Sequence, residues 1–249
     1  MKRPILVSIE GNIGAGKSTV LENMELYFKN DKVLFLKEPV DLWEQFRDDD
    51  GKTILEKFYA DKSRYGFTFQ VMAYITRLSL LKNAIKENPD VDVIIIERSL
   101  CADKNIFMNM LHDDGIVENM EYNIYNKWYD EFIKDYRVDA VIYMDSNPEI
   151  CLERIAKRSR TGEAGIPLEY LSKCRDYHSK WLLHNCCNHV NMNDYVEIHQ
   201  INHEGYKYPV LHINSNTDTV YEPENYESLT VGNQWLKTIK EFIYTFPNR

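Results

Sequence analysis

Short apolar runs rich in β-branched residues recur along the chain and alternate with longer segments of helical periodicity. The apolar runs predict five strands, at residues 5–10, 32–38, 91–97, 140–145 and 210–214. None of these runs alternates cleanly between polar and apolar positions, which is typical of parallel strands covered on both faces.

Helical periodicity predicts helices at residues 17–29, 64–88, 103–113, 118–135, 147–158, 167–187 and 224–245. Alternating strands and helices favour an α/β fold: a doubly wound, five-stranded parallel sheet flanked by helices. No repeat, low-complexity tract or linker divides the pattern, so we expect a single domain over residues 1–249.

One stretch, residues 188–208, is polar and has no clear period. We expect it to form a long surface excursion before the last strand. Its histidines could indicate a metal site, but a solvated loop is the favoured interpretation; they are His189, His199 and His203.

Composition and charge narrow the class of protein. The formal net charge of -9 and the pI of about 5.3 argue against a polynucleotide partner. Five cysteines without a Cys-x-x-Cys pair or zinc spacing indicate reduced thiols. No apolar run reaches the roughly 18 residues of a membrane span. The first strand begins too early for a signal peptide, so we expect a cytoplasmic protein without membrane association.

The segment GNIGAGKST, residues 11–19, matches G-x-x-x-x-G-K-[ST] and lies between a predicted strand and a predicted helix. In such a P-loop the backbone N–H groups and the helix N-terminus bind phosphate. Lys17 would reach the β- and γ-phosphates, and Ser18 would bind Mg²⁺. The predicted phosphate-binding residues are Gly11, Asn12, Ile13, Gly14, Ala15, Gly16, Lys17, Ser18 and Thr19. The motif leaves the phosphate acceptor open.

Charged residues follow two other strands, where open α/β sheets build their sites. Glu38 could take a proton from an acceptor hydroxyl, or could be a solvated residue at the strand end. Glu97 lies where a P-loop protein has its second Mg²⁺ carboxylate. Arg98 could pair with Glu38 or bind the acceptor, although an ordinary ion pair at the strand end is the alternative.

A basic cluster lies at the end of the helix predicted at 147–158. It could form a mobile lid of about residues 154–166 over transferring phosphates, or a solvated helix end. Its cations are Arg154, Lys157, Arg158 and Arg160. Glu163 lies alone among them and needs a hydroxyl or cationic partner.

The segment FTFQVMAYITR, residues 67–77, reads as a buried helix, yet it contains Gln70 and Arg77 two helical turns apart. A buried amide and a buried guanidinium both need partners.

Taken together, GNIGAGKS, EPVDLW, FTFQ with Arg77, ERS followed by Asp103, and RSRTGEAGIPLEYL resemble the deoxynucleoside kinases of the deoxycytidine/deoxyguanosine kinase type. The motifs have the order and spacing of that family over nearly the whole chain. The polar stretch 188–208 is longer than the family pattern and is the main departure.

The resemblance implies a catalytic arrangement. Glu38 would be the general base for the 5′-hydroxyl, and Arg98 would hold both that hydroxyl and Glu38. Ser18 and Glu97 would hold Mg²⁺. The lid residues that stabilise the transferring phosphoryl would be Arg154, Arg158 and Arg160.

The resemblance also implies a nucleoside site. Tyr59 and Glu163 would bind the 3′-hydroxyl of the deoxyribose. The walls of the base site would be Trp43, Phe69 and Phe107, and the edge of the base would be read by Gln70, Arg77 and Asp103. A Gln amide both donates and accepts, while an ionised Asp only accepts and so favours an amine on the base.

The implied activity is transfer of the γ-phosphoryl of ATP, or another NTP such as UTP, to deoxycytidine, deoxyadenosine or deoxyguanosine rather than thymidine. The implied partners are Mg²⁺, the nucleoside, the NTP and a second copy of the chain, docked through helices near 103–135.

Three alternatives remain at this stage. A thymidine-preferring kinase of the same fold is disfavoured by Arg77 with Asp103. A nucleoside monophosphate kinase has an anionic acceptor that Glu38 would repel. A non-catalytic P-loop regulatory protein would not need Glu38, Arg98 and the basic cluster together.

Overall fold

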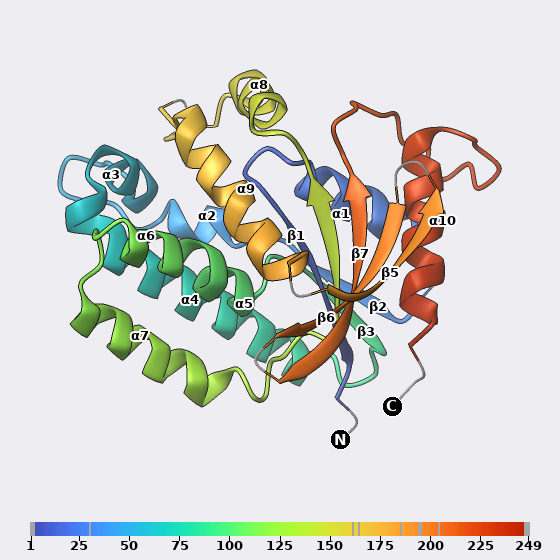
Figure 1. Ribbon diagram of the computed structural model, residues 1–249, viewed down its shortest axis with the longest axis horizontal. Coiled ribbons are helices and arrows are strands. Elements are labelled where there is room, and N and C mark those ends of the chain that lie inside the picture. The colour runs from blue at the N-terminus through green and yellow to red at the C-terminus, as the bar shows by residue number, and fades with distance from the viewer. Residues whose placement is uncertain are drawn as a thin grey trace.

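A computed structural model describes residues 3–29, 31–160, 162–163, 165–184, 186–193, 196–203 and 205–246, and for 186–193 it describes the backbone only (Figure 1). The described strands form one seven-stranded sheet in the order β2-β3-β1-β4-β7-β6-β5.

The five expected strands form the parallel part of this sheet. They are β1 (Ile5–Gly11), β2 (Val33–Leu36), β3 (Val93–Glu97), β4 (Ala140–Asp145) and β7 (Tyr206–Asn214). The predicted α/β fold with a five-stranded parallel core is therefore confirmed. Alternate residues of each strand enter different cores: Leu6 packs on one face of the sheet, and Val7 packs on the other.

The interpretation of residues 188–208 as a solvated loop is wrong. Strands β5 (Cys186–Asn193) and β6 (Val196–His203) run antiparallel and extend the sheet beyond β7. The buried positions of β6 are Val196, His199 and Ile201; Val196 packs in the core on one face of the sheet and Ile201 in the core on the other. A buried histidine and this uneven spacing hide the strand period in the sequence. Register pairs the backbone of His189 with that of His199, and the side chain of His189 lies outside the described residues.

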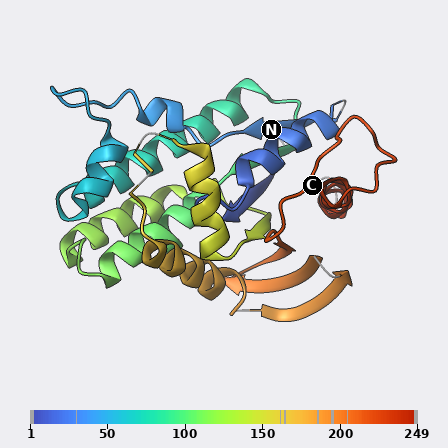
Figure 2. The ribbon, with the colours of Figure 1, turned by 90° about the horizontal axis from the view of Figure 1, so that it is seen from above.

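Helices cover both faces of the sheet (Figures 1 and 2). On one face α1 (Lys17–Tyr27) and α10 (Val231–Tyr244) bury their apolar sides. On the other lie α4 (Lys62–Glu87) and α7 (Asn119–Phe132). Helices α8 (Pro148–Arg158) and α9 (Leu168–Leu182) follow β4.

Several helix boundaries differ from the prediction. Helix α9 ends at Leu182, five residues early, because the chain then turns into the β5–β6 hairpin. Residues 224–230 are not helical; Thr230 caps α10 by accepting the backbone N–H of Asn233 at 3.2 Å. Two short helices were not expected from the sequence, α2 (Val40–Trp43) and α3 (Ile54–Ala60).

The helix predicted at 103–113 contains an irregularity. It begins as α5 (Leu100–Ala102), widens into the π-helical segment η1 (Asp103–Met108) and ends as α6 (Asn109–Asp113). Single π turns occur frequently at functional sites because they turn side chains away from the ordinary helical positions. Here η1 carries Asp103 and Phe107, both named above as nucleoside-site residues.

Cys101, Cys151 and Cys174 are buried, and among the described residues none of the three forms a disulfide; the side chains of Cys186 and Cys187 lie outside the described residues. Among the described helices, none combines the length and the apolar character needed to cross a bilayer.

Candidate active site

A cleft of about 690 Å³ lies at the carboxyl edge of the parallel strands, between the P-loop, α4, η1 and the segment after α8. Every residue predicted for catalysis, Mg²⁺ binding and nucleoside binding lines this cleft. The predicted phosphate-binding residues also line it, apart from Gly11 and Asn12. The topology thus brings together residues that are far apart in sequence, while their individual roles stay predictions.

Backbone geometry explains the glycines of the P-loop. Gly11 has a φ of 145° and Gly14 a φ of 80°. A Cβ on Gly11 would lie 2.5 Å from the carbonyl oxygen of Met144, and a Cβ on Gly14 would lie 2.5 Å from that of Cys151. The loop therefore packs directly against backbone atoms of β4 and α8, and a side chain cannot fit at either position.

Lys17 and Ser18 begin α1 and face the cleft. The Lys17 ammonium donates to the Asn12 carbonyl at 2.8 Å. Burial, together with nearby Arg98, lowers the pKa of Lys17 to about 8. The Ser18 hydroxyl donates to Glu97 Oε1 at 2.7 Å, so a hydroxyl and a carboxylate oxygen lie side by side at the phosphate end. These two oxygen ligands, next to a phosphate-binding loop, fit Mg²⁺.

Glu38 follows β2 and lies between two guanidinium groups. Arg77 Nη2 donates to Glu38 Oε1 at 2.9 Å, and Arg98 Nε lies 3.3 Å from the same oxygen. Burial raises the pKa of Glu38, but the positive charges of Arg98, Arg77 and Lys17 outweigh it and lower the pKa to about 2. Glu38 is consequently ionised at neutral pH and can only accept hydrogen bonds.

Arg98 adopts a backbone conformation that is rare for a non-glycine residue, with a φ of 63°. Such a residue costs about 1–3 kcal/mol and persists where its surroundings hold it. Its backbone N–H donates to the Ile9 carbonyl at 3.0 Å, and its guanidinium lies 4.9 Å from the Phe107 ring centroid. Its buried Nη1 has no hydrogen-bond partner among the described residues, so one donor is left for a ligand.

Arg77 is the most connected of the predicted residues. Its Nε donates to Asp103 Oδ2 at 3.0 Å, its Nη1 to the Glu97 carbonyl at 3.0 Å, and its Nη2 to Glu38. Burial raises the pKa of Asp103 above its usual value, and the Arg77 guanidinium limits that rise. Arg77 therefore joins the ends of β2 and β3 to η1.

Gln70 lies on the same face of α4 as Arg77, as the sequence predicts. It is buried, and its Oε1 has no hydrogen-bond partner among the described residues. The neighbouring wall is aromatic: the Trp43 and Phe69 rings meet edge to face at 5.6 Å, and Phe69 stacks on Phe58 at 4.6 Å. An open amide oxygen inside an aromatic slot suits a planar, polar-edged ligand.

The basic segment forms ion pairs of two kinds. Arg154 donates to Asp218 at 2.9 Å and to the Ser215 carbonyl at 3.0 Å, and so fastens α8 to the loop after β7. Arg158 and Arg160 both pair with Glu163, which is buried. Glu163 is thus not alone, because the turn after α8 carries it back to the helix end. Thr161 and Ala164 of the predicted lid lie outside the described residues.

Sequence reasoning missed the segment after β7. The cleft is also lined by Ser215, Thr217, Asp218, Thr219 and Tyr221. These residues directly follow a parallel strand, so the rule that singled out Glu38 and Glu97 also applies to them.

Comparison with known proteins agrees with this geometry. The model of the deoxynucleoside kinase family matches residues 7–240. The probable deoxycytidine kinase of Fowlpox virus (strain NVSL) is 35% identical, with 95% of this chain and 87% of the viral protein covered. The deoxycytidine kinase of Homo sapiens is 32% identical, with 96% and 91% covered. The human mitochondrial thymidine kinase 2 is 35% identical, with 72% and 64% covered.

The family match spans the P-loop, both strand-end carboxylates, α4 and the basic segment, which are the elements that surround the cleft. We conclude that the chain belongs to the deoxynucleoside kinase family.

Proposed function

We propose that this protein transfers the γ-phosphoryl group of ATP or another NTP to the 5′-hydroxyl of a deoxynucleoside, with deoxycytidine and the purine deoxynucleosides preferred over thymidine. The observation that carries the proposal is the cleft itself. Its phosphate end has the P-loop with Lys17, its aromatic end has Gln70, and Glu38 lies between them, fixed by Arg77 and Arg98.

Positioning and charge stabilisation account for most of the catalysis in such a transfer, because its transition state is loose. Lys17 and the P-loop amides would hold the donor phosphates. Arg98 would donate to the acceptor hydroxyl, and Glu38 would accept its proton. Mg²⁺, held by Ser18 and Glu97, would neutralise charge on the phosphates.

The pKa of Glu38 decides what kind of base it can be. A pKa of about 2 makes it a weak base, far from the ideal near neutral pH. In a loose transition state the acceptor loses its proton late, so a weak but well-oriented carboxylate suffices. Glu38 would then act mainly by orienting the hydroxyl.

Substrate preference follows from the charge at the far end of the cleft. Asp103 is an acceptor, and Gln70 offers both a donor and an acceptor, which suits a base with an exocyclic amine. Thymidine has a carbonyl where deoxycytidine has its amine, and a 5-methyl group besides. Although a thymidine kinase is among the similar proteins, the buried Arg77–Asp103 pair supports the deoxycytidine and purine assignment.

Two rival activities fit the cleft less well. A nucleoside monophosphate would bring its charge beside ionised Glu38, which would repel it. A regulatory protein that only binds nucleotide has no need for a carboxylate held by two buried arginines, since burying these charges is costly.

We further propose a homodimer formed through α7 and α4. Met120, Ile124 and Trp128 are 72%, 49% and 55% exposed and recur every four residues along α7. Val71 and Ile75 are exposed on α4, which packs beside α7 through Tyr74 and Tyr125. A continuous apolar stripe of this kind is typical of an interaction surface. We also propose a cytoplasmic location, supported by the buried free thiols of Cys151 and Cys174.

Initial rates with the four deoxynucleosides, each with Mg²⁺ and either ATP or UTP, test the proposed activity. We expect phosphorylation of deoxycytidine and at least one purine deoxynucleoside. The kcat/KM for thymidine should be lower than that for deoxycytidine by roughly tenfold or more. Absence of turnover with all four would refute the proposed function, and a thymidine preference would refute the assigned specificity.

Glu38→Gln tests the role of the carboxylate. The variant keeps the shape of the side chain but weakens both ion pairs and removes the basicity, so kcat should fall by about 10²–10⁴ with nucleoside affinity largely kept. Steady-state rates and equilibrium binding measure the two effects. Glu87→Gln, on an exposed carboxylate at the end of α4, is the matched control. A wild-type kcat in Glu38→Gln would remove Glu38 from the mechanism.

Arg77→Met with Asp103→Ala tests how the base is read. Arg77→Met alone leaves Asp103 buried without its cation and takes one arginine from Glu38, so all substrates should be impaired. The double variant removes both charges and makes room for a methyl group. It should raise the thymidine to deoxycytidine ratio of kcat/KM by about tenfold or more, at a lower absolute rate.

The four-substrate profile of wild type, single and double variants is the measurement. Arg64→Met, on an exposed arginine of the same helix, is the control. An unchanged ratio in the double variant would mean that Gln70 reads the base without the ion pair.

Trp128→Glu tests the dimer. Placing a charge at the centre of the α7 stripe should halve the mass measured by light scattering at micromolar protein concentration. Leu229→Glu, at an exposed leucine far along the chain, should leave the mass unchanged. A monomeric wild type, or a variant that remains dimeric, would exclude this interface.

A further inference from the structure

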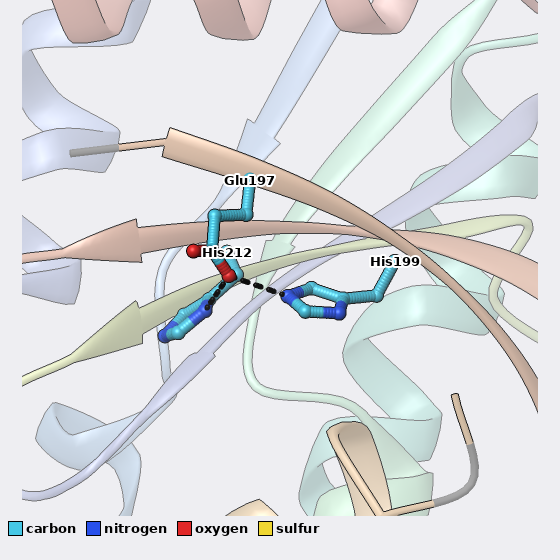
Figure 3. Close-up of side chains that lie close together, drawn as sticks. All are labelled: Glu197, His199 and His212. Atoms are coloured by element: carbon cyan, nitrogen blue, oxygen red, sulfur yellow. Dashed lines mark hydrogen bonds and ion pairs between the residues drawn. The ribbon is translucent and has the colours of Figure 1, made fainter. Parts of the chain in front are cut away.

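Two histidines and a glutamate come together on the sheet, outside the catalytic cleft. Glu197 and His199 lie two residues apart on β6, and His212 lies directly opposite Glu197 on β7. Two-residue spacing and direct pairing put all three side chains on one face of the sheet. Figure 3 shows both imidazole rings turned toward the Glu197 carboxylate.

The donor atoms lie close enough together to approach one metal ion. Glu197 Oε2 lies 3.2 Å from His199 Nε2 and 3.6 Å from His212 Nδ1. The ligand atoms of the three side chains all lie within 4.8 Å of one another. Two ligands at about 2.0–2.2 Å from a tetrahedral zinc ion are separated by roughly 3.3–3.6 Å. The two distances that involve Glu197 match this separation, and the histidine nitrogens, within 4.8 Å of each other, would move closer to bind one ion.

The orientation of His212 gives an independent argument. Its Nε2 lies 3.2 Å from Asp145 Oδ2, and Asp145 is also bound by Arg175 at 3.0 Å and 3.3 Å. A carboxylate paired with an arginine is an acceptor, so His212 Nε2 carries the proton. In the neutral ring the Nδ1 lone pair then points toward the Glu197 carboxylate.

Two acceptors that face each other repel unless a metal ion or a second ring proton lies between them. Buried Nδ1 of His212 has no hydrogen-bond partner among the described residues. A metal ion would satisfy it, and Asp145 would supply the carboxylate–histidine contact that orients metal-binding histidines in many proteins. A second proton on His212 is the alternative, and it would leave the ring unable to bind metal.

Packing holds the rings in place. His212 stacks on Tyr143 at 5.3 Å, and Tyr143 stacks on buried His178 of α9 at 5.8 Å. The side chain of His199 is 11% exposed, while that of Glu197 is 35% exposed and leaves a path from solvent. The ligands are therefore largely preorganised and yet accessible.

We propose that Glu197, His199 and His212 bind one divalent ion of the zinc class, with solvent completing the coordination. Imidazole ligands select zinc over magnesium, which prefers oxygen ligands, so this site is chemically distinct from the Mg²⁺ site at Ser18 and Glu97. The ion would bind β6 and β7 to each other and so stabilise the edge of the sheet where the β5–β6 hairpin lies.

Zinc binding to tag-free, chelator-treated protein tests the proposal. Equilibrium dialysis with metal analysis, in the presence of millimolar Mg²⁺, should find one zinc per chain. Saturating zinc should raise Tm by about 5 °C or more, because it binds only the folded chain. Cobalt in place of zinc should give the visible absorption of a low-symmetry site with nitrogen ligands.

His199→Ala and Glu197→Gln should each weaken zinc binding by at least about tenfold. His184→Ala, at an exposed histidine beyond α9, is the matched control and should bind as wild type does. All three variants should keep their kinase rate with Mg²⁺ and ATP, which reports correct folding. If His199→Ala does not fold, Glu197→Gln, which keeps the side-chain shape, decides.

Substoichiometric zinc on the wild type, below about one ion per ten chains, would overturn the proposal. So would variants that bind zinc as tightly as the wild type, because the ion would then occupy other residues.

Discussion

The cleft depends on one buried guanidinium. Arg77 is placed in the core by α4, and its donors bind the Asp103 carboxylate, the Glu38 carboxylate and the Glu97 carbonyl. Removing the charges of Arg77, Asp103 and Glu38 from water is costly, and only close, well-oriented hydrogen bonds offset that cost. The ends of β2 and β3 and the start of η1 must therefore lie where the guanidinium can reach them. The geometry of the site follows from this requirement more than from any single loop.

This arrangement couples the two ends of the cleft. The same arginine pairs with Asp103 at the proposed base site and with Glu38 at the proposed reacting centre. Arg98, held in its left-handed conformation after β3, is the second cation on Glu38. A change in the proposed base site would therefore alter the electrostatics of the proposed reacting centre, so specificity and rate are expected to change together when these charges are altered.

The sequence predicted the parallel core well, because strands buried on both faces are continuous apolar runs that differ clearly from helical segments. The sequence also predicted that the site residues lie close together, since the P-loop motif and the ends of parallel strands meet at one edge of a sheet. It failed for β6, where His199 is buried and the buried positions Val196, His199 and Ile201 are unevenly spaced because they lie on both faces of the sheet. It also gave no sign of the π-helical turn that begins at Asp103, whose carboxylate accepts from Arg77 Nε at 3.0 Å.

The β5–β6 hairpin gives the sheet a different edge. Without it, β7 would expose its backbone groups along one side, and unpaired edges invite association with other chains. Antiparallel pairing with β6 covers that edge and brings His199 and Glu197 beside His212. Asp145 links this cluster to the phosphate end of the cleft. Its side chain binds His212, and its backbone carbonyl accepts the N–H of Ser215. The carbonyl of Ser215 in turn accepts from Arg154. The histidine cluster at the sheet edge and the basic segment are thus connected through Asp145, and the position of β7 affects both.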